Sequence, residues 1–114
     1  MEILNAKIES ADLSMEDHGC LTLRLTVVGK GWGANLGGYC LGNGYLGADK
    51  FKGSAKGIEE IMRIMDVVGV ERFKDLEGKY VRVVEESYTA PIHKIGNIIE
   101  DKWFDYKEFY EDND

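Results

Sequence analysis

The sequence has 114 residues, of which 44% are hydrophobic, so it predicts one folded domain over residues 1–110 and excludes an intrinsically disordered chain. The formal net charge is −7, from 21 acidic and 14 basic residues, which disfavours direct nucleic-acid binding and favours a basic partner or simple solubility. No apolar run has the length of a membrane helix, and the first residues lack a signal-peptide pattern. We therefore expect a cytoplasmic protein with no membrane partner, whose residues 111–114 form a frayed acidic tail.

The first part of the chain predicts a β-hairpin. Residues 2–9 alternate between apolar and polar side chains, with Leu4, Ala6 and Ile8 on one face. Turn-forming residues follow at 17–19, and residues 20–28 then alternate again, which is the clearest strand pattern in the chain. In this second strand we expect one face to consist of Leu21, Leu23, Leu25 and Val27.

The next segments change from strand to helix. Residues 36–42 predict a third strand weakened by glycines, and residues 43–53 predict a loop. Residues 54–68 have apolar side chains at helical spacing, with Ser54 as N-cap and Gly69 just beyond the C-terminal end. The side chains expected to form the buried stripe of this helix are Ile58, Ile61, Met62, Ile64, Met65, Val67 and Val68.

The last third of the chain predicts a helical turn at 71–78, with Phe73 and Leu76 inward, strands at 79–86 and 92–99, and a short C-terminal helix. This terminal helix is expected to dock on the core through Trp103, Phe104 and Phe109. The order of elements indicates an α+β fold: a mostly antiparallel sheet of about five strands packed against one main helix, followed by the short helix.

The most unusual segment spans residues 29–47, where eight of nineteen residues are glycine and three aromatic side chains lie between them. Glycine amides can surround a phosphate, and aromatic rings can stack on a base, so the segment predicts a nucleotide pocket. It matches neither the P-loop nor the dinucleotide-binding pattern. The structural alternative is a twisted, bulged hairpin whose rings cover the glycines. The predicted ligand-binding residues are Arg24, Lys30, Gly31, Trp32, Gly33, Gly37, Gly38, Tyr39 and Tyr45.

The C-terminal segment from Glu100 to Asp114 has seven acidic residues and two lysines. Such a segment can imitate the charge of a nucleic-acid backbone toward a basic groove. The alternative is an amphipathic helix with its aromatic side chains on the core and its acids in solvent. The predicted partner-binding residues are Glu100, Asp101, Asp105, Glu108, Glu111 and Asp112.

Catalytic and metal signatures are weak. Asp17 and His18 are adjacent, and neighbours on a strand point to opposite faces, so a turn with a solvated histidine is favoured over a catalytic pair. His93 is the other histidine of the chain. No nucleophile is evident for either histidine, so we expect no enzyme activity. The two histidines and the two cysteines, Cys20 and Cys40, lack zinc-ligand spacing, so no metal and no cofactor are expected. Both cysteines are predicted to be reduced, small core residues without a disulfide.

Four segments carry a family resemblance: "DHGCLTLRL", "GGYCLGNGYLGAD", "IMRIMDVVGVERFKDLEGKYVRV" and "IGNIIEDKWFD". They resemble a family of small proteins encoded by tailed phages and prophages, which has no assigned activity, and the resemblance extends over roughly residues 2–105. One departure is Leu36, where the pattern has an aromatic residue before "GGY".

The resemblance implies an accessory protein that acts on the host. Our first hypothesis is a counter-defence binding protein that sequesters a host nucleotide-derived signal without catalysis, with its ligand pocket at residues 29–47 or between subunits of a homo-oligomer. The alternative is a protein inhibitor of a host defence complex, of the anti-CRISPR kind, that uses the acidic C-terminal segment. A third hypothesis, an enzyme acting on a nucleotide or on nucleic acid, would depend on Asp17, His18 and His93.

Overall fold

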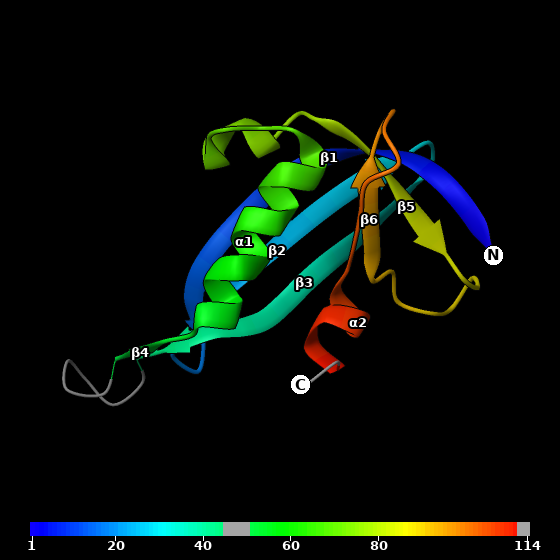
Figure 1. Cartoon of the computed structure of the whole chain (residues 1–114). Coiled ribbons are helices and arrows are strands. Elements are labelled where there is room, and N and C mark those ends of the chain that lie inside the picture. Colours follow the sequence, from blue (N-terminus) through cyan, green and yellow to red (C-terminus); the bar gives the residue numbers. More distant parts are fainter. Residues whose placement is uncertain (45–50, 112–114) are drawn as a thin grey trace.

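The computed structural model describes residues 1–44 and 51–111 (Figure 1). It confirms an α+β fold with a mostly antiparallel sheet, one main helix and a short C-terminal helix. The sheet is curled and its spatial order is β4-β3-β2-β1-β5-β6-β7. The strands are β1 (Glu2–Asp17), β2 (Cys20–Gly29), β3 (Trp32–Asn43), β4 (Lys52–Gly53), β5 (Tyr80–Glu85), β6 (Lys94–Asn97) and β7 (Trp103–Asp105).

The expectation of about five strands was too low. One additional strand, β4, lies in the segment predicted as a loop, where it pairs with β3 only at Gly42 and Asn43. The other, β7, precedes the C-terminal helix and pairs with β6. Both strands are two or three residues long, which is too short for an alternating pattern to be visible in the sequence.

Strand β1 lies in the middle of the sheet and pairs with both β2 and β5. It continues well beyond residue 9, because a register shift between Ile8 and Ser10 restores the apolar alternation on the same face. After the shift, Ala11 lies opposite Leu25 and Leu13 opposite Leu23. The predicted turn is therefore confined to the end of the hairpin, at His18 and Gly19, which both have positive φ.

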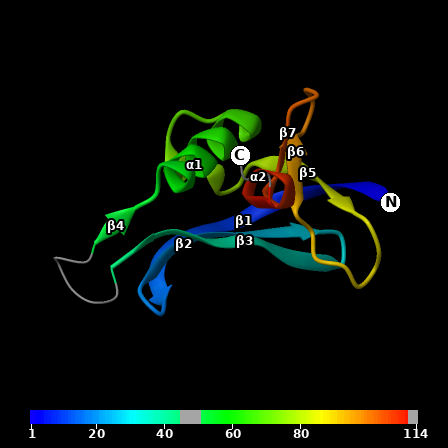
Figure 2. The ribbon, with the colours of Figure 1, turned by 60° about the horizontal axis from the view of Figure 1, so that its bottom comes forward.

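The concave side of β1–β3 is covered by helix α1 (Ala55–Val68) and by the short helix α2 (Tyr106–Glu111), as Figure 2 shows. The predicted ends of α1 are confirmed. The Ser54 hydroxyl accepts a hydrogen bond from the amide of Gly57, and Gly69 adopts φ 92° beyond the last turn.

The predicted buried face of α1 was partly wrong. Ile58 and Met62 are 56% and 64% exposed, and the inward side chains are Glu60, Ile64, Val67 and Val68. The cause is Gly57, where an added Cβ would lie 2.7 Å from the Leu41 backbone. The missing side chain lets this turn approach β3 closely, and that contact fixes the rotation of the helix.

The remaining predictions about packing have mixed outcomes. The 3-10 helix η2 (Phe73–Leu76) is confirmed, and its Leu76 is fully buried. Phe104 is buried and Phe109 is partly buried against the core. The prediction that both cysteines are core residues was wrong, because Cys20 is half-buried and Cys40 is exposed; as expected, both are free thiols. Of the predicted tail 111–114, Glu111 closes α2 and residues 112–114 lie outside the described residues.

Candidate functional site

The glycine-rich segment forms the β2–β3 hairpin and most of β3. Lys30 and Gly31 are the two turn residues between Gly29 and Trp32, and both are exposed. The Trp32 indole lies directly on Gly29, where an added Cβ would be 2.1 Å from its Nε1 atom. One face of the ring predicted to stack on a base is therefore in contact with the backbone of the hairpin. Gly33 follows on the strand opposite Val28.

A bulge interrupts β3 at Gly37 and Gly38, which have φ values of 90° and 87°. The bulge changes which residues of the strand face inward. Leu36 precedes it and is buried; beyond it, Tyr39 and Leu41 face the core, and Cys40 faces out. This change of face explains why Cys40 is not a core residue.

Tyr39 belongs to a cluster of tyrosines beneath α2. Its ring stacks on Tyr110 at a centroid distance of 4.3 Å and on Tyr106 at 5.7 Å. The Tyr110 hydroxyl donates a short hydrogen bond to Glu60 Oε1. Glu60 is fully buried, and burial raises the pKa of its carboxyl to about 7. The cluster thus ties α2 to α1 and β3, so the Tyr39 ring stacks on protein.

The sequence contains no pattern that predicts this cluster. A single glutamate within the apolar positions of a helix is normally solvent-exposed, and nothing in the spacing relates Glu60 to a tyrosine fifty residues later. The only available signal was the number of aromatic residues in the C-terminal segment. Two polar atoms of the cluster, Glu60 Oε2 and the Tyr106 hydroxyl, have no hydrogen-bond partner among the described residues.

Arg24 lies apart from Tyr39, on the outer face of the sheet. Its guanidinium passes over Gly38, with Nε 3.1 Å from the position of an added Cβ. Arg24 lines a hollow of about 200 Å³ together with Thr22 and Ser14, and the same hollow contains the carboxylates of Asp12, Glu16 and Asp17. The negative charges beside this arginine weaken its attraction for a phosphate.

The predicted ligand-binding residues are therefore distributed over three places: the hairpin turn, the inner tyrosine cluster and the outer face. Tyr45 lies outside the described residues. The nucleotide pocket predicted from these residues stays a prediction.

The acidic C-terminal residues are divided between two places. Glu100 and Asp101 lie at the β6–β7 turn, where the Asp101 carboxylate accepts a hydrogen bond from the Trp103 indole. Asp105 and Glu108 line a groove of about 380 Å³ between α1 and the β7–α2 segment. Glu111 ends α2, and Asp112 lies outside the described residues. We call this hollow the C-terminal groove; it is lined by Lys56, Glu59, Arg63, Trp103, Phe104, Asp105, Glu108 and Phe109.

The groove combines carboxylates with aromatic surface. Glu59 is bound to Arg63 at 2.6 Å within the helix, and the Lys56 ammonium lies 5.0 Å from the Phe109 ring centroid. The Phe109 ring thus has a cation of the chain itself within cation–π distance. Trp103, at the edge of the sheet, has the Arg82 guanidinium 4.8 Å from its ring centroid in the same way.

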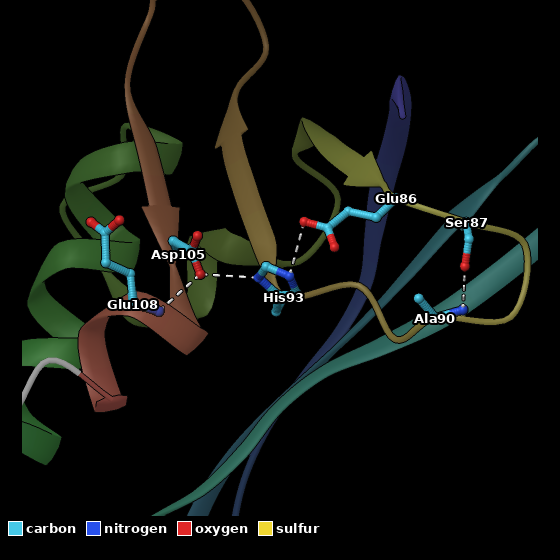
Figure 3. Close-up of polar contacts among 6 residues, drawn as sticks. All are labelled: Glu86, Ser87, Ala90, His93, Asp105 and Glu108. Atoms are coloured by element: carbon cyan, nitrogen blue, oxygen red, sulfur yellow. Dashed lines mark hydrogen bonds and ion pairs between the residues drawn. The ribbon is translucent and has the colours of Figure 1, made fainter.

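Asp105 is held in place by His93 (Figure 3). The two nitrogens of the His93 ring lie 3.0 Å from Asp105 Oδ1 and 3.3 Å from Glu86 Oε2. Asp105 also accepts a hydrogen bond from the amide of Glu108, at the start of α2. Burial raises the pKa of Asp105, but the hydrogen bonds from Glu108 and His93 outweigh burial and hold that pKa below its usual value.

A histidine between two carboxylates could move a proton, but the arrangement also has a structural explanation: it fixes β7 and the first turn of α2 against the loop after β5. The hydroxyl of Ser87, in that loop, accepts a hydrogen bond from the Ala90 amide (Figure 3). The other histidine, His18, lies in the exposed β1–β2 turn, where its Nδ1 atom is 3.0 Å from Oδ1 of its neighbour Asp17. In the part of the chain that the structure describes, no three histidine, cysteine, aspartate or glutamate side chains are placed so that they could hold a metal ion together.

Comparisons with known proteins yield no matching family model, no similar curated protein and no similar solved structure. Within residues 1–44 and 51–111, none of the helices has the length and apolarity needed to cross a membrane.

Proposed function

We propose that this chain is a counter-defence protein that acts by binding, and that it presents the C-terminal groove to a basic surface of a host protein. The observation that supports this proposal is the convergence of three acidic side chains from three elements on one groove: Glu59 from α1, Asp105 from β7 and Glu108 from α2. Lys56 and Arg63 line the same groove and Arg63 pairs with Glu59, so the proposal depends mainly on Asp105 and Glu108. The reason for proposing a host defence system as the target is the sequence resemblance to phage proteins.

Guanidinium and ammonium groups suit the chemistry of this groove. A carboxylate provides a charge-assisted hydrogen bond, and an adjacent ring face provides a cation–π contact. Asp105 is pre-oriented by His93 and the Glu108 amide, so it needs no ordering on binding. Glu108 is exposed at the rim, where its charge would increase the association rate with a positively charged partner.

The second candidate is sequestration of a nucleotide at the β2–β3 hairpin. The observation that favours it is the exposed Arg24 guanidinium beside Gly38, which has no side chain of its own. The acidic hollow around Arg24 and the intramolecular stacking of Tyr39 make this candidate the weaker one.

The test is phage plating on bacterial strains that each carry one immune system and express the protein. We expect the wild-type chain to restore plating in at least one strain. The double variant Glu108→Lys/Glu111→Lys should lose this rescue, because it reverses charge at the groove and α2, and Trp32→Ala should keep it. The matched control is Glu2→Lys/Glu9→Lys, which changes the net charge equally at exposed positions of β1.

Three results would oppose the proposal in different ways. Loss of rescue in the control pair would indicate a general effect of charge. Loss with Trp32→Ala and retention with the groove variant would favour the nucleotide candidate, which a thermal shift with a set of cyclic nucleotides would then confirm. Absence of rescue by the wild-type chain in every strain would remove the counter-defence function.

A further inference from the structure

Strand β3 has an open side. It pairs with β2 along its whole length, but on its other side it pairs with β4 only at Gly42 and Asn43. From Trp32 to Leu41, none of the described strands lies beyond it, and Figures 1 and 2 show β3 as the border of the sheet. A strand with an open side directs alternate backbone N–H and C=O groups outward, where they can pair with another strand.

This border lacks the features that usually prevent such pairing. All twelve residues of β3 are uncharged and none is proline. In the sequence, the uncharged stretch continues from Gly31 to Ala48, although 31% of the chain is charged. In contrast, β1 has six charged residues among sixteen, and four of them lie in residues 9–17, where β1 pairs with β2 but not with β5. Border strands normally carry charges, especially lysine, or proline.

We propose that a second copy of this chain pairs its β3 with this open side, antiparallel, over the segment Trp32–Leu36. The segment is regular, since its register with β2 runs unbroken from Gly29–Trp32 to Leu25–Leu36, and the bulge at Gly37 and Gly38 limits it. An antiparallel pair of identical strands has a two-fold axis, here near Ala34, and makes one continuous sheet from two copies. This inference is independent of the proposed function.

Charge selects a second copy as the occupant. Two copies that each have a net charge of −7 repel one another, so they can approach most easily where each surface is uncharged. Identical strands that carried charges would place like charges at close range, which is destabilising. A charged peptide would find no ion-pair partner on this strand. Gly33 and Ala34 have the smallest side chains of the segment and permit close approach of the two backbones.

The test uses two opposite charges at Asn35, an exposed residue of this segment. With the axis near Ala34, the two Asn35 side chains become diagonal neighbours, roughly 7–8 Å apart. Asn35→Asp keeps the oxygen that accepts the hydrogen bond from the Thr26 hydroxyl. Asn35→Lys reduces the net negative charge of the chain, yet it also places two lysines, one from each copy, on either side of the two-fold axis. The matched controls are Asn5→Asp and Asn5→Lys, on β1 inside the sheet.

Sedimentation velocity of the full chain at 1–200 µM should show a wild-type dimer. Both Asn35 variants should raise the dissociation constant of the dimer by about three- to tenfold at low salt. The increase should be smaller at high salt, because salt screens the repulsion between the two copies. Both Asn5 variants should dimerise like the wild type. Hydrogen exchange should show concentration-dependent protection of the amides of residues 33–36.

A wild-type chain that is monomeric throughout this range would overturn the inference. A dimer that Asn35→Asp weakens and Asn35→Lys strengthens would also overturn it, because net charge alone would explain that result. Protection confined to other strands would place the interface elsewhere and refute the pairing of β3.

Discussion

Replacement of Glu60 by glutamine should remove a large part of the pH dependence of stability. Glu60 is fully buried, one of its oxygens accepts a hydrogen bond from Tyr110, and the other has no partner among the described residues. Burial raises the pKa of this carboxyl to about 7 from a value of 4.5. Glutamine has nearly the same shape, keeps an oxygen acceptor for the Tyr110 hydroxyl and carries no charge at any pH.

The magnitude follows from linkage between protonation and folding. Between pH 4.5 and about 7, the folded chain keeps the Glu60 proton while the unfolded chain releases it. Stability therefore falls as the pH rises through this window, and the loss is complete above the folded-state pKa. At about 1.4 kcal/mol for each pH unit, the loss is roughly 3 kcal/mol. The E60Q variant lacks this loss.

The assay is urea denaturation at pH 5, 6, 7 and 8. We expect the difference in unfolding free energy between E60Q and the wild type to increase by roughly 3 kcal/mol in favour of the variant from pH 5 to pH 8. Glu59→Gln is the control: Glu59 is exposed and paired with Arg63, so its removal should change stability by less than about 0.5 kcal/mol. A difference between E60Q and the wild type that stays constant from pH 5 to pH 8 would refute a buried, protonated Glu60.

Three further substitutions test the packing. Tyr106→Phe removes a buried hydroxyl that has no described partner, so thermal denaturation should show equal or higher stability, by up to about 1 kcal/mol. Gly57→Ala should destabilise the fold by about 2 kcal/mol in urea, although alanine favours helices, because its Cβ would meet Leu41; unchanged stability would mean that α1 does not contact β3 there. Gly37→Ala should cost more than 2 kcal/mol, since it combines positive φ with a Cβ only 2.4 Å from the Leu23 carbonyl; a cost under 1 kcal/mol would contradict the bulge.

Local patterns predicted the elements whose causes are local. The alternation in residues 2–9 and 20–28 indicated the central hairpin, and the cap residues Ser54 and Gly69 marked the ends of α1 within one position. These predictions succeeded because side-chain period and capping depend only on neighbours a few residues apart.

Contacts between residues far apart in the sequence explain where the structure differs from the predictions. The rotation of α1 depends on Gly57 meeting Leu41 of β3, and apolar spacing alone selected Ile58 and Met62 instead. The exposure of Cys40 depends on a bulge two residues earlier, which reverses the faces of the strand. A glycine pair does not reveal from sequence alone whether it binds a ligand or forms a bulge.

The candidate site was predicted only in part. Asp105 and Glu108 were named from charge, and the structure places both on one groove. Glu59 and Arg63, which line the same groove, come from α1, about forty-five residues earlier, and no spacing rule connects the two segments. His93 was considered as an isolated histidine, and its position between Glu86 and Asp105 becomes apparent only when β6 and β7 are paired.

The central place of β1 has a consequence for synthesis of the chain. Its second neighbour, β5, begins at Tyr80, about sixty residues after β1 ends. At roughly 5–20 residues per second, a ribosome needs several seconds to produce that interval. During this time the nascent hairpin has an unsatisfied flank along residues 2–7, so early binding by a chaperone would protect it from pairing with another polypeptide.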